Sequence, residues 1–187
     1  MTKETKLGTS RTNVFRERTA EDIEGNLAFN WHYDRTLFGG LVKDIYLMEG
    51  KEVDDPKFNS FTYHDVERNQ VVPILNDEDI CVHMGMSMHV YTAGHFKASC
   101  HGVRIPAIPG LKRISQAYFV QPMPELRFEP PVADYQVPDV EEHDVGLVEN
   151  VVGYKHNMWK DMTYADWNDR INNSYQALFN YQATLNK

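Results

Sequence analysis

Three residues have side chains and a spacing suited to binding a divalent metal ion. His32 and Asp34 are separated by one residue, and side chains two positions apart on a β-strand project from the same face. His101, on a later strand-like segment, offers a third ligand. Two histidines and one carboxylate bind Fe(II) on one face and leave the opposite positions open. We therefore expect these three residues to bind a metal, although a His-x-Asp pair alone more often has an ordinary hydrogen-bonding role.

A second pair of residues could bind an organic carboxylate beside that metal. Arg113 and Ser115 are two residues apart and so share a strand face. A guanidinium offers a planar fork of donors that matches a carboxylate, and the serine hydroxyl adds another donor. An isolated Arg-x-Ser is usually a surface ion pair and a solvated hydroxyl. The position of this pair, shortly after His101, favours the binding role.

Other residues near these positions have simpler interpretations. His95 is the main alternative to His101 as the third metal ligand. Cys100 should point away from the metal because side chains alternate along a strand, and it is interpreted as a packing residue. The remaining histidines are expected to lie on the surface or to be hydrogen-bonded; they are His64, His83, His89 and His143.

The composition limits the class of protein. With 187 residues, of which 42% are hydrophobic, we expect a single domain over residues 1–187, with residues 1–12 as a flexible lead-in. Acidic residues outnumber basic ones by 27 to 19, which argues against nucleic acid and anionic membranes as partners. The sequence lacks a secretory signal and an apolar stretch of about eighteen residues. Two cysteines fit a reducing compartment, so a cytoplasmic location is expected.

Short strands with turn signals between them predict a mainly β fold. Gly39 and Gly40 are expected to break the chain between two strands, and Gly85 to mark a bulge or a close approach of the backbone. The strand at 70–75 contains a proline and should lie at a sheet edge. The methionines that alternate in the strand at 80–91 should fill the interior. The expected strands are 26–34, 41–48, 60–66, 70–75, 80–91, 96–104 and 113–120. This series predicts a sandwich or a jelly roll.

One helix is expected, close to the end of the sequence. Thr163 and Asp166 match a capping pair at a helix start. After them, large apolar residues recur at intervals of three and four, and this stripe should pack on the sheet. The stripe contains Tyr164, Trp167, Ile171, Tyr175, Leu178 and Tyr181. The proline-rich and acidic residues 122–149 are expected to be irregular chain on the surface.

These motifs together resemble the Fe(II)- and 2-oxoglutarate-dependent oxygenases of the isopenicillin N synthase-like group. The resemblance covers roughly residues 13–122 and implies a double-stranded β-helix, or jelly roll, with a C-terminal α-helix. The segment 79–85 looks like a strand of that family. The matching motifs, in the family's order, are His32-x-Asp34, Gly94-x-Phe96-Lys97-Ala98-x-x-His101-x-Val103, Arg113-x-Ser115 and Tyr118-Phe119-Val120-Gln121-Pro122.

The sequence departs from this family at three places. Met86 follows Gly85 where the family usually has an acidic residue. Asn13-Val14-Phe15 resembles an Asn-x-Tyr motif that helps to hold 2-oxoglutarate, so Asn13 is interpreted as a cofactor-binding residue, but Phe15 lacks the hydroxyl. Family members also have a much longer N-terminal half, so the resemblance is to their C-terminal catalytic half with a short N-terminus.

The resemblance implies an enzyme, an Fe(II)/2-oxoglutarate-dependent dioxygenase. Fe(II) would be held by His32, Asp34 and His101, and 2-oxoglutarate would chelate the metal and place its distal carboxylate at Arg113 and Ser115. Oxidative decarboxylation of 2-oxoglutarate by dioxygen would be coupled to hydroxylation, or a related oxidation, of a small organic molecule. Two alternatives are a catalytically silent jelly-roll protein that binds a metal or ligand, and an oxidase of the same fold that does not use 2-oxoglutarate.

Overall fold

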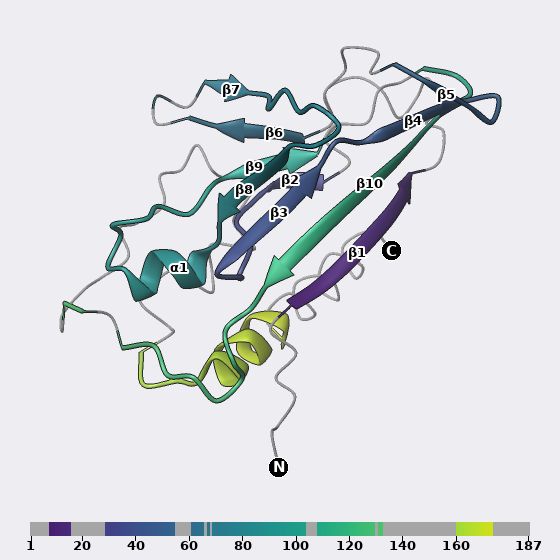
Figure 1. The fold of residues 1–187 in the computed structure, drawn as a ribbon. Helices are drawn as coiled ribbons and strands as arrows, with labels where there is room; N and C mark the ends of the chain where they lie inside the picture. Colours follow the sequence, from purple (N-terminus) through teal and green to yellow (C-terminus); the bar gives the residue numbers. More distant parts are fainter. Residues whose placement is uncertain are drawn as a thin grey trace, which may run out of the picture.

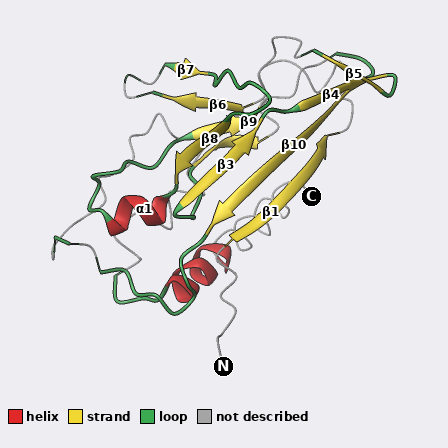
Figure 2. Ribbon diagram, in the orientation of Figure 1, coloured by secondary structure: helices red, strands yellow, loops and turns green. Residues whose placement is uncertain are grey.

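The computed structural model describes residues 8–15, 29–54, 61–65, 67, 69–103, 108–129, 131–132 and 160–173. These residues form two antiparallel β-sheets and two helical segments (Figures 1 and 2). The larger sheet contains β1 (Gly8–Phe15), β3 (Phe38–Val42), β4 (Ile45–Met48), β5 (Lys51–Val53), β8 (Ile80–Met84) and β10 (Leu111–Val120). The smaller sheet contains β2 (Phe29–His32), β6 (Phe61–His64), β7 (Gln70–Val71) and β9 (His101–Val103). The predicted mainly β jelly roll with a C-terminal helix is confirmed.

The longest strand, β10, organises the larger sheet. It pairs with β1 over residues 113–120, with β3 over residues 117–120 and with β4 over residues 111–114. Its side chains alternate between the two faces, so that Leu111, Arg113, Ser115 and Ala117 are buried. Arg113 and Ser115 therefore share the inner face of the sheet, as their spacing predicts.

The methionine-rich segment is a strand followed by a helix, and the prediction of one strand over residues 80–91 was wrong. β8 ends at Met84, and α1 covers Met86–Tyr91. The first amides of a helix have no partner within the helix; here the backbone N–H of Met86 donates to the carbonyl of Asp34 at 2.7 Å. The backbone N–H of Ser87 donates to the carbonyl of Thr36 at 3.2 Å. These tertiary hydrogen bonds favour a turn into a helix here.

The close backbone approach predicted at Gly85 is confirmed. A Cβ atom at this position would lie 2.1 Å from the carbonyl oxygen of Thr36, so only glycine fits where β8 ends and α1 begins. The methionines do not alternate across a sheet. Met86 and Val90, one helical turn apart, are both buried on one side of α1.

Several strand boundaries also differ from the predictions. Gly39 and Gly40 lie inside β3 and do not break it, and β9 begins at His101 and not at 96. β7 has two residues and lies at a sheet edge, as the proline predicted. Residues 8–12, expected in a flexible lead-in, belong to β1, because backbone hydrogen bonding to β10 requires no apolar pattern. The single domain over residues 1–187 stays a prediction.

The expected C-terminal helix is present at residues 164–173. The hydroxyl of Thr163 donates to Asp166 Oδ2 at 2.7 Å, and the Asp166 N–H donates back to that hydroxyl at 3.2 Å, which confirms the capping pair. The helix packs with α1, at the same end of the molecule in Figure 1. Their shared core contains Tyr164, Trp167, Ile171, Met86, Val90 and Phe128. The rest of the predicted stripe, Tyr175, Leu178 and Tyr181, lies outside the described residues.

Within the described part of the chain, no helix has the length and apolar character to cross a membrane.

Candidate metal site

Two of the predicted metal ligands lie side by side on adjacent strands of the smaller sheet. His32 ends β2, His101 begins β9, and their Cα atoms are partners in the antiparallel pairing of these strands. The centroids of the two imidazole rings are 4.2 Å apart. Partners in an antiparallel pair project from the same face. The register of two short strands therefore brings together histidines 69 positions apart in the sequence (101 minus 32).

The third predicted ligand, Asp34, lies just after β2, where the chain crosses to the larger sheet. Its backbone carbonyl accepts the hydrogen bond from the start of α1. His32 Nε2 lies 3.7 Å from Asp34 Oδ1, and His101 Nε2 lies 3.8 Å from Asp34 Oδ2. One potential ligand atom from each of the three residues lies within 4.8 Å of the others. The structure thus brings together all three residues that the sequence singled out.

The imidazole of His101 is held in the form that a metal requires. Its Nδ1 lies 3.0 Å from the carbonyl oxygen of Ser99, and since a carbonyl can only accept, Nδ1 carries the proton. Nε2, which faces Asp34, is then left with its lone pair. Burial and the neighbouring His32 lower the pKa of His101 to about 3. The ring is therefore neutral and able to bind a metal at physiological pH.

The carboxyl group of Asp34 is ionised in this site. Burial by itself would raise its pKa, but the hydrogen bond from His83 and the nearby imidazoles lower the pKa to about 2. The His101 side chain is 2% exposed, whereas those of His32 and Asp34 are 21% and 17% exposed. One side of the cluster is therefore open to solvent. Two imidazoles, one carboxylate and an open side fit a divalent metal ion with free coordination positions.

Cys100 points away from the cluster, as predicted, and His95 does not contribute to it. Cys100 is buried and packs against Trp31 and Tyr33, on the side away from the cluster. His95, the alternative third ligand, is exposed, and its ring contacts Phe96 with centroids 5.0 Å apart. His95 therefore lies outside the ligand set.

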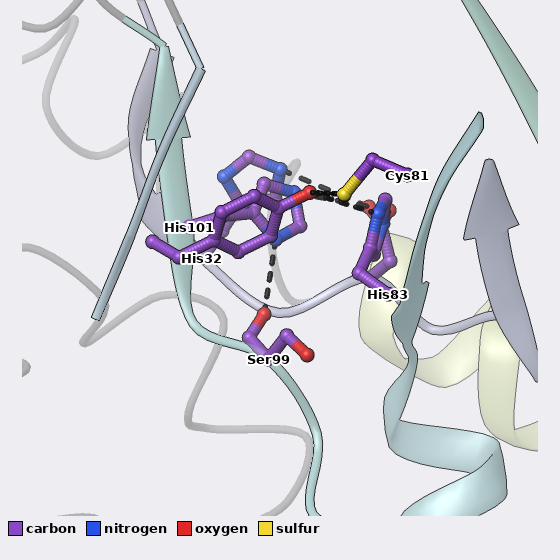
Figure 3. Close-up of polar contacts among 7 residues, drawn as sticks. His32, Cys81, His83, Ser99 and His101 are labelled. Carbon is purple, nitrogen blue, oxygen red and sulfur yellow. Dashed lines mark hydrogen bonds and ion pairs between the residues drawn. The ribbon is translucent and has the colours of Figure 1, made fainter. Parts of the chain in front are cut away.

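One histidine lies at the site without having been predicted there. His83, expected to be a surface or hydrogen-bonded residue, is 4% exposed and hydrogen-bonded to Asp34, with 2.9 Å between Nε2 and Oδ2. It projects from β8 of the larger sheet toward His32 and His101 (Figure 3). Side chains alternate along β8, with Ile80 and Val82 exposed and His83 facing inward. Because apolar residues ordinarily face the interior, the sequence alone predicts the opposite orientation and contains no signal for His83.

The predicted carboxylate-binding residues are buried, but the arginine already has an acidic partner. Arg113 is 2% and Ser115 6% exposed, and Arg113 Nε donates to Asp44 Oδ2 at 2.8 Å. Asn13 lies opposite Ser115 in the pairing of β1 with β10; its side chain is outside the described residues. The structure therefore does not place a side-chain donor of Asn13 at the site.

A cavity of about 190 Å³ is lined by residues that contact Arg113 and His101, although neither of these two residues lines it. Its lining includes Asp44, the partner of Arg113, and Tyr46. It also includes Phe61, whose ring stacks on that of His101 with centroids 4.9 Å apart. A small ligand in this cavity would lie against neighbours of both His101 and Arg113.

Comparisons with solved structures show what this arrangement is similar to. A Neurospora crassa protein in complex with α-ketoglutarate and thymine has a TM-score of 0.58 and 14% identity, covering 90% of this chain and 44% of that one. The rice dioxygenase for auxin oxidation has a TM-score of 0.55 and 15% identity, covering 80% and 48%. JOX2 in complex with 2-oxoglutarate, iron and JA has a TM-score of 0.50 and 15% identity, covering 70% and 34%.

These likenesses establish the fold. Each aligned region spans less than half of the similar protein's own length. A scan against protein-family models found no match, and a search of curated proteins found no similar sequence.

Proposed function

We propose that this protein is a non-haem iron oxygenase, which couples oxidative decarboxylation of 2-oxoglutarate to hydroxylation or a related oxidation of a small organic molecule. The observation that carries the proposal is the convergence of His32, Asp34 and His101, with their ligand atoms within 4.8 Å of one another. Similar structures contain 2-oxoglutarate, and one contains iron. A purely structural jelly roll has no need of this convergent polar set.

The three residues of the cluster would hold Fe(II), which supplies the redox chemistry that activates dioxygen when it is bound. His101 presents Nε2 because Ser99 fixes the proton on Nδ1. Asp34 contributes a negative charge that offsets part of the charge of the ion. The exposed side, formed by His32 and Asp34, leaves access for substrate and dioxygen.

Arg113 and Ser115 would bind the distal carboxylate of 2-oxoglutarate. Both project from β10 into the interior between the sheets, where a guanidinium and a hydroxyl are strong donors to a carboxylate. The side chains of Leu41, Tyr46 and Phe61 line a cavity beside Asp44, the partner of Arg113, and give this cavity a partly apolar wall.

An anaerobic titration tests this function. Fe(II) and then 2-oxoglutarate are added to the folded protein, and the weak visible charge-transfer band of the metal chelate is recorded. We expect the band in the natural protein, and Arg113→Ala should weaken 2-oxoglutarate binding without removing the metal. Lys112→Ala is the matched control, because Lys112 is the exposed neighbour on the opposite face of β10. Absence of the band in folded, metal-loaded protein contradicts the proposal.

A second candidate is an oxidase of the same fold, or a metal-binding protein, that does not use 2-oxoglutarate. The observation that favours it is the hydrogen bond from Arg113 to Asp44, because an internal carboxylate already neutralises the arginine. Metal binding without any response to 2-oxoglutarate would select this candidate.

A further inference from the structure

A fourth side chain, His83, projects toward the candidate metal cluster from the larger sheet. The three candidate ligands come from β2, β9 and the connection after β2, whereas His83 comes from β8 of the larger sheet. Its ring lies 4.8 Å from that of His101 between centroids, and its Nε2 lies 2.9 Å from Asp34 Oδ2. The labelled residues in Figure 3 show His83 facing His32 and His101 across the site.

The hydrogen bond of His83 to Asp34 requires a proton on Nε2. The carboxylate of Asp34 can only accept, so Nε2 of His83 donates to it. Nδ1 lies 3.3 Å from the hydroxyl of Tyr63, so both ring nitrogens have a hydrogen-bonding partner. That hydroxyl also lies 3.5 Å from Cys81 Sγ. Because Nε2 carries this proton, it offers no lone pair to a metal. The contact of His83 with the site is therefore its hydrogen bond to the Asp34 carboxylate.

We propose that His83 is a positioning residue that holds the Asp34 carboxylate in the orientation that binds the metal, an inference that rests on the proposed function. By holding Oδ2, the imidazole limits rotation of the carboxylate and leaves Oδ1 toward His32. Carboxylates that bind metals are commonly oriented by such hydrogen bonds, and losing the partner typically lowers metal affinity about 10- to 100-fold. The contact also joins the two sheets at the site.

Gly39 provides the space for His83. The two residues are partners in the pairing of β3 with β8, and a Cβ atom on Gly39 would lie 2.4 Å from both Cε1 and Nε2 of the imidazole. Real contacts of this kind are longer, so Gly39→Ala must displace the nitrogen that bonds Asp34. A Cβ atom on the adjacent Gly40 would have its nearest neighbour at an ordinary 3.6 Å, from Ile80.

The pair of glycines therefore gives a matched test that leaves every polar side chain in place. Gly39→Ala should lower the affinity for Co(II), a spectroscopically visible substitute for Fe(II), by about 10- to 100-fold. Gly40→Ala should leave the affinity unchanged, and urea unfolding would show that both variants fold. Equal Co(II) affinities for Gly39→Ala, Gly40→Ala and the natural protein would overturn the proposal.

Substitutions of His83 itself separate positioning from packing. His83→Phe keeps a ring but removes the donor and should lower Co(II) affinity as Gly39→Ala does. His83→Gln keeps an N–H near the position of Nε2 and should restore most of the affinity. If Phe and Gln variants bind Co(II) equally well, His83 only packs. Pulsed EPR of the Cu(II)-loaded protein should count two coordinated imidazoles, and a third that disappears in His83→Gln would make His83 a ligand and overturn the proposal.

An experiment on the metal-free protein keeps this inference distinct from the proposed function. Nitrogen NMR of the histidine rings should show His83 protonated at Nε2 and should show a change in that signal in Asp34→Ala. A His83 ring protonated at Nδ1 would overturn the positioning role whether or not metal binds. Failure of the natural protein to bind any metal would instead overturn the oxygenase proposal.

Discussion

At the scale of single residues, the buried His101 and His83 differ in which ring nitrogen donates a hydrogen bond, and this difference gives them different roles. His101 donates from Nδ1 to the carbonyl of Ser99, so its Nε2 is free of a proton and faces Asp34. His83 donates from Nε2 to Asp34, so the corresponding nitrogen already carries a proton. The two rings come within 4.8 Å of each other between centroids, but only the first presents a metal-binding lone pair to the cluster.

His101→Ala should abolish metal binding, because it removes the most deeply buried of the three candidate ligands. His95→Ala should leave metal binding unchanged, because His95 lies outside the cluster. Equilibrium titration with Fe(II) under anaerobic conditions measures both affinities, and circular dichroism establishes that each variant is folded. Metal affinity preserved in the folded His101 variant would move the third ligand elsewhere.

Asp44→Asn should have opposite effects on stability and on ligand binding. Removing the counter-ion of the buried Arg113 should lower the free energy of unfolding by up to about 3 kcal/mol. The uncompensated guanidinium should then bind 2-oxoglutarate more tightly, on the order of tenfold, or about 1.4 kcal/mol. Urea unfolding and calorimetric titration measure the two effects.

The control for this variant is Asp77→Asn, at an exposed ion pair with Lys43. Exposed pairs contribute little to stability, so this variant should resemble the natural protein in both measurements. Weaker 2-oxoglutarate binding in Asp44→Asn would instead mean that Asp44 orients Arg113 for its ligand.

At the scale of elements, hydrogen bonds near the two ends of α1 connect it to the chain segments that carry or lead to candidate ligands. Its first amides bind the carbonyls of the 34–36 segment and so place Asp34. Near its other end, His89 Nδ1 accepts the backbone N–H of Ala98 at 3.2 Å, which ties the helix to the chain that leads into β9. A helix of six residues thus connects the segments that carry two of the three candidate ligands.

The bond to His89 predicts a dependence of stability on pH. Burial and the charge of Lys97 lower the pKa of His89 below its usual 6.5, so the folded state binds this proton less readily than the unfolded state. The stabilisation is present above pH 6.5 and is lost as the pH falls below that value, by at most about 1.4 kcal/mol per pH unit. Urea unfolding between pH 8 and about pH 5 should show a shallower pH slope for His89→Gln than for the natural protein. Identical slopes would contradict the assignment.

The capping pair at the start of the C-terminal helix gives a second prediction for an element. Thr163→Ala removes the hydroxyl that accepts the Asp166 N–H and should lower the free energy of unfolding by about 1 kcal/mol. Thr163→Ser keeps the hydroxyl and should lie close to the natural protein. A loss of the same size in both variants, measured by urea unfolding, would assign the effect to the methyl group.

At the scale of the whole molecule, the candidate site lies where the two sheets meet. The smaller sheet supplies His32 and His101, the crossing segment supplies Asp34, and the larger sheet supplies His83. Apart from His32 and Asp34, which are two residues apart in the sequence, these side chains would be far from one another in an unfolded chain. A metal that binds all three ligands should therefore bind the folded state far better than the unfolded state.

This coupling predicts that the metal stabilises the entire fold. At a free metal concentration about 100 times the dissociation constant, the free energy of unfolding should rise by about 2.7 kcal/mol. Urea unfolding with and without Co(II) measures the change. His101→Ala should show no such increase, and stabilisation of that variant by Co(II) would indicate a metal site elsewhere.

The sequence by itself indicated the candidate ligand set and the strands on or beside which these residues lie. His32-x-Asp34, His101 and Arg113-x-Ser115 could be singled out because strand periodicity and side-chain chemistry are local properties of the sequence. The capping pair of the C-terminal helix is local in the same sense, and the structure contains it.

Only the tertiary structure decided the helix α1, the role of His83 and the pairing of Arg113 with Asp44. Each depends on partners distant in the sequence: carbonyls of the 34–36 segment, the carboxylate of Asp34, and an acid 69 positions before the arginine. Periodicity cannot reveal such partners, because hydrogen bonds and ion pairs depend on distances that exist only once the two sheets have packed.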